Sequence, residues 1–200
     1  MSETLTSAPS RREKHKARTR QALRETALQL FASQGYDSTT AEEIAEKVGV
    51  SARTFFRYFS TKESALFIGR HDWIESFGAM YLDQPAGLTD VEALLASYVL
   101  VAPQLTRTRK ALKLYERAVA SSPTLRGREQ DYREADVAAL AGAIATRREL
   151  SETDEDCRLL ASVSFLTHRR ALDLWLAGPA SASLADAITE EFERLKQLFP

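Results

Sequence analysis

The sequence predicts an all-α protein of about nine helices, divided between a small N-terminal domain and a larger C-terminal body. Apolar residues recur at three- and four-residue spacing, which is the period of an amphipathic helix. Gly and Pro are scarce, with 8 and 6 in 200 residues. Hydrophobic residues make up 44% of the chain, which is enough for a buried core. No stretch shows the two-residue alternation of a half-buried strand.

The chain is expected to begin with a flexible arm, residues 1–10, because this stretch is rich in Ser and Thr and has no apolar period. A helix should follow from about Arg12 and end at Gly35, a residue type that favours the C-terminal cap. Its predicted buried face consists of Leu23, Ala27, Leu30 and Phe31.

Two short helices come next. The segment Thr40–Glu43 has the pattern of a capping box, in which the Thr hydroxyl and the Glu carboxylate each bind a backbone amide at the start of a helix. Gly49 ends this helix, and Ser51 is placed to cap a third helix that runs through Phe59. Two helices joined by a three- or four-residue turn predict a helix-turn-helix.

The remaining elements follow from similar caps. Residues 60–63 repeat the capping-box pattern and predict one helix to about Met80, and residues 89–92 predict another that ends at about Ala102, before Pro103. Further helices are expected at 105–120, 123–148, 153–177 and 183–199. We therefore expect an arm (1–10), a small N-terminal domain (11–67) and a larger C-terminal domain (68–200).

Positive charge is concentrated near the N-terminus, although the formal net charge is only -1. Between Arg11 and Arg24 there are seven basic residues against one acid, Glu13. They are Arg11, Arg12, Lys14, Lys16, Arg18, Arg20 and Arg24. Such a stretch suits contact with phosphates along a DNA backbone or in a minor groove, but a solvated helix face has the same composition.

The third predicted helix has the chemistry of a DNA-reading element. Its exposed positions should be Ala52, Arg53, Thr54, Phe56, Arg57 and Tyr58. These residues carry no negative charge, and Arg, Thr and Tyr side chains can bind phosphates or base edges in the major groove. Arg can also bind guanine through two hydrogen bonds.

With these residues in register, the segment 23–66 resembles the N-terminal domain of the TetR/AcrR family of transcriptional regulators. The matching residues are Phe31, Gly35, Tyr36, Thr39, Thr40, Ile44, Ala45, Gly49, Val50, Ser51, Phe56, Tyr58, Phe59, Lys62, Glu63 and Leu66. The variant reading helix, with Arg53 and Phe56, is similar to a subgroup that includes mycofactocin-type regulators and regulators of acyl-CoA-like ligands.

The resemblance implies that Thr40, Thr54, Tyr58 and Lys62 bind backbone phosphates. Arg53 and Arg57 are the candidates for reading bases, although either could bind phosphate instead. Ser51, at the start of the reading helix, completes the expected set of DNA-binding residues. Phe56 is left out, because it lacks the hydroxyl that most relatives would direct at phosphate.

The resemblance also implies a repressor that binds a palindromic DNA operator as a homodimer and is released by a small molecule. Residues 11–67 would then be the DNA-binding domain, and residues 68–200 the ligand-binding and dimerisation domain. Leu-rich segments at 159–176 and 184–199 can supply the dimer interface or ordinary core packing. An amphipathic or aromatic ligand would lie among central helices. The candidate ligand residues are Trp73, Phe77, Tyr98, Tyr115, Arg117 and His168. Such aromatic spacing is also typical of a plain core.

Other classes of protein find less support. The three His residues lie far apart and there is one Cys, so no metal-ligand spacing, nucleophile motif or phosphate loop is present, and we expect neither an enzyme nor a cofactor or metal. A single Cys and the lack of a long apolar segment predict a cytoplasmic protein without a membrane span. The alternatives are an all-helical protein-interaction module, or an activator that uses the same helix-turn-helix.

Overall fold

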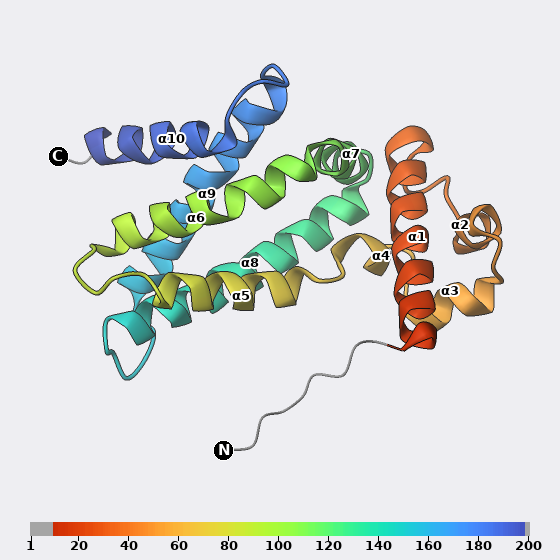
Figure 1. The fold of residues 1–200 in the computed structure, drawn as a ribbon, viewed down its shortest axis with the longest axis horizontal. Helices are drawn as coiled ribbons and strands as arrows, with labels where there is room; N and C mark the ends of the chain where they lie inside the picture. Colours follow the sequence, from red (N-terminus) through yellow and green to blue (C-terminus); the bar gives the residue numbers. More distant parts are fainter. Residues whose placement is uncertain (1–9, 199–200) are drawn as a thin grey trace. The chain divides into compact units, whose positions relative to one another are not determined.

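The computed structural model describes residues 10–198, and every regular element in this range is a helix. The helices are α1 (Arg11–Gln34), α2 (Ala41–Val48), α3 (Ala52–Tyr58), α4 (Ser64–Phe67), α5 (Arg70–Leu82), α6 (Asp90–Arg107), α7 (Arg109–Ala120), α8 (Pro123–Arg147), α9 (Glu155–Ala177) and α10 (Leu184–Leu198) (Figure 1). The all-α prediction is confirmed for this part of the chain. The predicted arm falls mostly on residues 1–9, outside the described residues, whereas Ser10 already caps α1.

A single helix was expected over residues 60–80, and this expectation is wrong. Gly69 has a φ of +83°, a left-handed conformation that favours glycine because a Cβ atom is strained there. The preceding residue, Ile68, is extended. The chain therefore forms the short α4 and then starts again as α5. The turn before α4 is held by Thr61 and Ser64, whose side-chain oxygens each accept the other's backbone N–H, at 3.3 and 3.2 Å.

The predicted end of a helix at Ala102 is also wrong, since α6 continues through Pro103 to Arg107. Proline removes one backbone hydrogen bond and usually interrupts a helix. Here Val101 and Ala102 are buried before the proline, and Leu105 packs against the same core after it. These tertiary contacts keep α6 helical on both sides of Pro103.

Contacts divide the chain into two units. The first unit holds the described residues up to Ile68 together with Leu114–Leu125, and the second holds Gly69–Lys113 and the described residues from Arg126 onwards. The core of the first unit contains Leu23, Ala27, Leu30, Phe31, Tyr36, Ala41, Ile44, Ala45, Phe55, Phe59, Ala65, Leu66, Phe67, Ala118, Val119 and Leu125. The sequence pattern did not predict that residues 114–125 belong to the first unit, because the apolar residues of this segment pack against residues that are distant in the sequence.

The second unit is a bundle in which α10 packs against α9 and α6, and α6 also packs against α5. Its largest buried side chains include Trp175, Tyr81, Tyr98, Phe77 and Phe192. The predicted capping box at the start of α6 is present, with the Thr89 N–H donating to Glu92 Oε2 at 2.8 Å. Within residues 10–198, no helix combines the length and apolar character needed to cross a bilayer.

Candidate nucleic-acid interface

The helix-turn-helix is built by local caps around α2 and α3. The Thr40 hydroxyl accepts the Glu43 N–H at 3.1 Å at the start of α2, so Thr40 is the N-cap as predicted. The capping box is only half formed, because the Glu43 carboxylate accepts from the Gln34 side-chain amide at 2.9 Å and not from the Thr40 N–H. Gly49 ends α2 with a φ of +76°. The Val50 N–H then donates back to the Ala45 carbonyl at 3.0 Å, which satisfies the last turn of α2 and directs the chain into α3.

The third helix is held to the core by one face and leaves the other face open. Phe55 is 0% exposed and Phe59 2%, and their ring centroids lie 5.1 Å apart. On the opposite face Arg53, Phe56 and Arg57 are exposed. The segment Ala52–Tyr58 contains no acidic residue, so this surface is cationic and apolar.

The polar residues at the start of α3 are mutually ordered. Ser51 accepts the Thr54 N–H at 3.2 Å, and the two hydroxyls share a hydrogen bond of 3.1 Å. At the other end of the helix, the Arg57 guanidinium lies 5.3 Å from the centre of the half-buried Tyr58 ring. Thr40, Ser51 and Arg57 are exposed, and Thr54 and Tyr58 are partly buried. All of these predicted contact residues except Lys62 therefore lie on or beside α2 and α3 with accessible polar groups.

The predicted phosphate ligand Lys62 has its ammonium group bound within the protein. Its ammonium group donates to the backbone carbonyls of Tyr36 and Thr39, at 2.7 and 2.8 Å, and lies 3.9 Å from the centre of the Tyr36 ring. The Tyr36 hydroxyl in turn donates to Glu63 at 2.8 Å. Lys62 thus joins the turn before α2 to the segment after α3.

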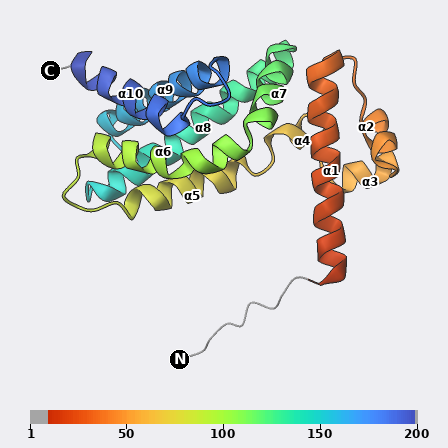
Figure 2. The ribbon, with the colours of Figure 1, turned by 45° about the horizontal axis from the view of Figure 1, so that its top comes forward.

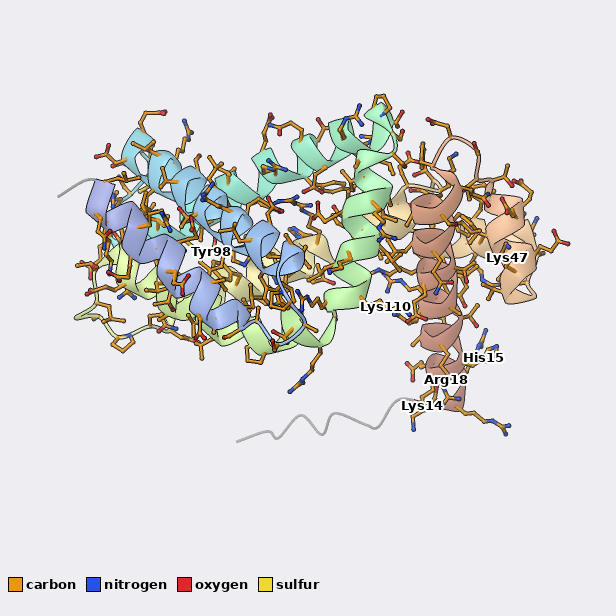
Figure 3. The ribbon with its side chains drawn as sticks, turned by 90° about the horizontal axis from the view of Figure 1, so that it is seen from above. Lys14, His15, Arg18, Lys47, Tyr98 and Lys110 are labelled. Carbon is orange, nitrogen blue, oxygen red and sulfur yellow. The ribbon has the colours of Figure 1, made fainter. Side chains whose placement is uncertain are left out.

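The six predicted ligand residues do not form one cluster. Four of them stack in the core of the second unit, with ring centroids 5.4 Å apart for Trp73 and Phe77, 4.5 Å for Phe77 and Tyr98, and 4.3 Å for Tyr98 and His168. Figure 3 labels Tyr98 within this bundle. Tyr115 and Arg117 belong instead to the first unit.

Tyr115 packs edge-on against Phe67 with ring centroids 6.1 Å apart, and Arg117 is exposed on α7. The sequence placed both residues with the ligand candidates because they are aromatic and basic residues in a central helix. That signal gives the composition of a helix, but it does not show which core the helix packs against.

His168 is the most unusual polar group of the stacked column. Its side chain is buried, and its Nε2 atom has no hydrogen-bond partner among the described residues. Burial, reinforced by the nearby charge of Arg169, lowers the pKa of His168 to about 3. The imidazole is therefore neutral at physiological pH.

Comparison with known proteins agrees with the geometry of the first unit. Residues 23–67 match the family described as bacterial regulatory proteins, tetR family. The chain is 40% identical over 90 residues to the HTH-type transcriptional regulator TcmR of Streptomyces glaucescens, an alignment that covers 45% of this chain and 40% of TcmR. The chain thus spans less than half the length of this relative. Both matches are regulators, in agreement with the expectation that the chain is not an enzyme.

Solved structures with a similar fold extend over most of the chain. A complex of SmeT with triclosan aligns with a TM-score of 0.66 at 18% identity and covers 90% of this chain and 91% of SmeT. Thermus thermophilus FadR in complex with lauroyl-CoA aligns with a TM-score of 0.56 at 22% identity and covers 90% and 95%. At these identities the likeness concerns the fold.

Proposed function

This chain belongs to the TetR family of bacterial regulatory proteins, and we propose that it is a repressor that binds a palindromic operator as a homodimer and is released by a small ligand. One observation carries the DNA-binding part. The outward face of α3 presents Arg53 and Arg57, with Thr54 and Tyr58 beside them and no acid along the helix. A buried face held by Phe55 leaves this surface free to enter a major groove.

Arg53 and Arg57 are proposed to read bases, while hydroxyls and amides at the starts of α2 and α3 bind phosphates. Phosphate contacts fix the register of a protein on DNA, and contacts to base edges supply the sequence preference. A good bidentate Arg contact contributes roughly 1–3 kcal/mol of discrimination between bases. Loss of both arginines should therefore remove most of the sequence preference.

The operator is first obtained by selecting bound duplexes from a random pool with the wild-type protein. Replacing Arg53 and Arg57 together by Ala should then weaken operator binding by at least about 100-fold, with weaker loss on random DNA. Fluorescence anisotropy at one fixed salt concentration measures both affinities. The control is Arg107→Ala with Arg128→Ala, two exposed arginines in the second unit. Unchanged operator affinity in the α3 variant would refute base reading by these arginines.

The proposed dimer interface uses the outward faces of α9 and α10. Leu159, Leu166 and Leu198 are 63%, 67% and 67% exposed. Leu159 and Leu166 lie seven residues apart and therefore share one face of α9, whereas Trp175 and Phe192 of the same two helices are buried within the protomer. Exposed leucines in line on a helix are typical of a surface that another molecule covers.

Leu159→Glu combined with Leu166→Glu should convert the protein to a monomer, because four charges would face one another across a two-fold interface. Sedimentation at micromolar concentration measures the state of assembly. Leu100→Glu is the control, since Leu100 is 60% exposed but lies on α6. A wild-type protein that stays monomeric would contradict the two-fold mechanism, and a double variant that stays dimeric would contradict this interface.

The ligand is proposed to bind in the second unit, beside the stacked column of Trp73, Phe77, Tyr98 and His168. Support comes from the column itself, with its neutral buried imidazole, and from similar folds that hold lauroyl-CoA and triclosan. Both ligands are amphipathic or aromatic. A ligand that prefers the non-binding conformation would shift the dimer away from DNA.

Ligand release is tested by adding a long-chain acyl-CoA or a halogenated biaryl ether to the protein–operator complex. Displacement of DNA by either compound is the expected result, and Tyr98→Ala should abolish it while the operator affinity of the free protein stays the same. The control compound is free coenzyme A, which lacks an apolar chain. Displacement that survives in Tyr98→Ala would place the ligand elsewhere.

A further inference from the structure

The amino-terminal half of α1 is a helix without a core beneath it. Every residue from Arg11 to Arg20 is exposed except Thr19, which is partly exposed, and the first buried residue of α1 is Leu23. The part of α1 that precedes Leu23 is about 18 Å long at 1.5 Å per residue. Figure 2 shows it extending past α2 and α3, and Figure 3 labels Lys14, His15 and Arg18 on it.

Three of its cations form a stripe, Arg12, Lys16 and Arg20, which we call the α1 stripe. Residues three or four positions apart share one face of a helix, and the α1 stripe continues at this spacing into Leu23 and Ala27. Those two residues are buried in the core that also holds Phe55 and Phe59 of the helix-turn-helix. The α1 stripe is therefore in phase with the face of α1 that is turned toward the reading unit.

We propose that the α1 stripe binds the phosphate backbone of DNA beside the base pairs that α3 reads. This inference rests on the proposed DNA-binding function and adds a second contact surface to it. Neighbouring cations of the stripe are about 6 Å apart along the helix, opposite a polyanion that carries about one charge per 1.7 Å of its axis. Arg11, Lys14 and Arg18 lie on other faces of the same segment.

The local structure of the segment supports a polyanionic partner. Its only acid, Glu13, is engaged in the cap of the helix, where it accepts the Ser10 N–H at 2.7 Å and the Ser10 hydroxyl accepts the Glu13 N–H at 3.2 Å. The remaining charges are positive and close enough to repel one another, which destabilises an isolated helix. Phosphates would relieve this repulsion, whereas burial against the protein's own core does not occur here.

The test compares two triple variants that remove the same charge from the same exposed segment. One is Arg12→Gln, Lys16→Gln and Arg20→Gln, and the matched control is Arg11→Gln, Lys14→Gln and Arg18→Gln. All six side chains are exposed, so both variants should keep the wild-type helix content by circular dichroism. Binding to the selected operator and to a random duplex is measured between about 50 and 200 mM NaCl, the range in which salt dependence is steep.

The α1 stripe variant should lower the slope of log Kd against log salt by about 2.7 per protomer, or about 0.9 for each lost phosphate contact. The loss should be equal on operator and random DNA, because phosphates carry no sequence information. The control variant should change the slope by less than about 0.9. Equal losses in the two variants, or no loss in either, would overturn the inference and leave the proposed function intact. A wild-type protein without sequence-selective DNA binding would overturn both.

Discussion

Replacing Arg70 by Met should lower the free energy of unfolding by about 3–5 kcal/mol, as expected when one partner of a buried ion pair is removed. The Arg70 guanidinium donates to Asp136 and to Glu129, each at 2.7 Å. The side chains of these acids are only 7% and 11% exposed. Without Arg70 they would lose the positive charge that ties them to the start of α5.

The loss should depend on pH in a defined direction. Burial raises the pKa of Asp136 even though the charge and hydrogen bond of Arg70 lower it, so removal of Arg70 takes away the largest effect that opposes burial. When an acid has a higher pKa in the folded than in the unfolded protein, the folded protein binds more protons, and its stability relative to the unfolded chain rises as the pH falls. Because Arg70 is the largest of the groups that lower this pKa, its loss moves the pKa of Asp136 further upward, and the deficit of the Arg70→Met variant should be largest at neutral pH and shrink in acid.

Chemical denaturation at several pH values measures this deficit. Adding Glu129→Gln and Asp136→Asn to Arg70→Met should recover most of the lost stability, because the buried negative charges that Arg70 compensated are then removed as well. Arg128→Met is the matched control, since Arg128 lies on α8 with its side chain 55% exposed and should change stability by less than about 1 kcal/mol. A loss of less than about 1 kcal/mol for Arg70→Met would contradict a stabilising role for its ion pairs with Glu129 and Asp136.

The wild-type protein should become less stable below pH 6.5 because of His168. Its pKa is about 3 in the folded protein and 6.5 without the protein environment. Between these values the unfolded chain binds a proton that the folded chain does not, so stability is complete above pH 6.5 and falls as the pH falls toward 3. The expected loss is about 2 kcal/mol at pH 5, at roughly 1.4 kcal/mol per pH unit.

His168→Phe should flatten this part of the stability profile. The variant keeps an aromatic ring against Tyr98, whose centroid lies 4.3 Å from that of His168, but it has no titratable group. Urea denaturation at several pH values measures the free energy of unfolding of both proteins. The difference between the two values isolates His168, because the other groups titrate equally in both. His15→Gln, at an exposed position, should keep the wild-type profile. A His168→Phe profile parallel to the wild type would contradict the low pKa.

The sequence was a good guide wherever a structural feature depends on residues a few positions apart. The caps at Thr40, Ser51 and Thr89 and the stop at Gly49 were predicted correctly. Each of them involves a side chain and a backbone group within about four residues, or a backbone angle that one residue type favours. The inward face of α3, with Phe55, follows from helical periodicity in the same way.

The same reasoning failed at two helix boundaries, one decided by distant contacts and one by a single glycine. Pro103 predicted the end of a helix, but core contacts on both sides carry α6 past it. Conversely, the capping pattern at residues 60–63 predicted one long helix, whereas the left-handed conformation of Gly69 divides it. At Pro103 a local preference of about 3 kcal/mol is outweighed by packing that the pattern does not contain. At Gly69 the capping pattern was instead overridden by the conformational freedom of a single glycine.

The helix-turn-helix, its caps and the cationic face of α3 were therefore determined by the sequence alone, because they depend on short-range spacing and on residue chemistry. Only the tertiary structure decided where Lys62 goes, since its bonds to Tyr36 and Thr39 span 26 and 23 residues. It also decided that Tyr115 packs in the first unit while Tyr98 and His168 stack in the second. Amphipathic periodicity shows that a helix face is buried, but the burial free energy is nearly the same against any apolar partner, so the partner emerges only when the whole chain packs.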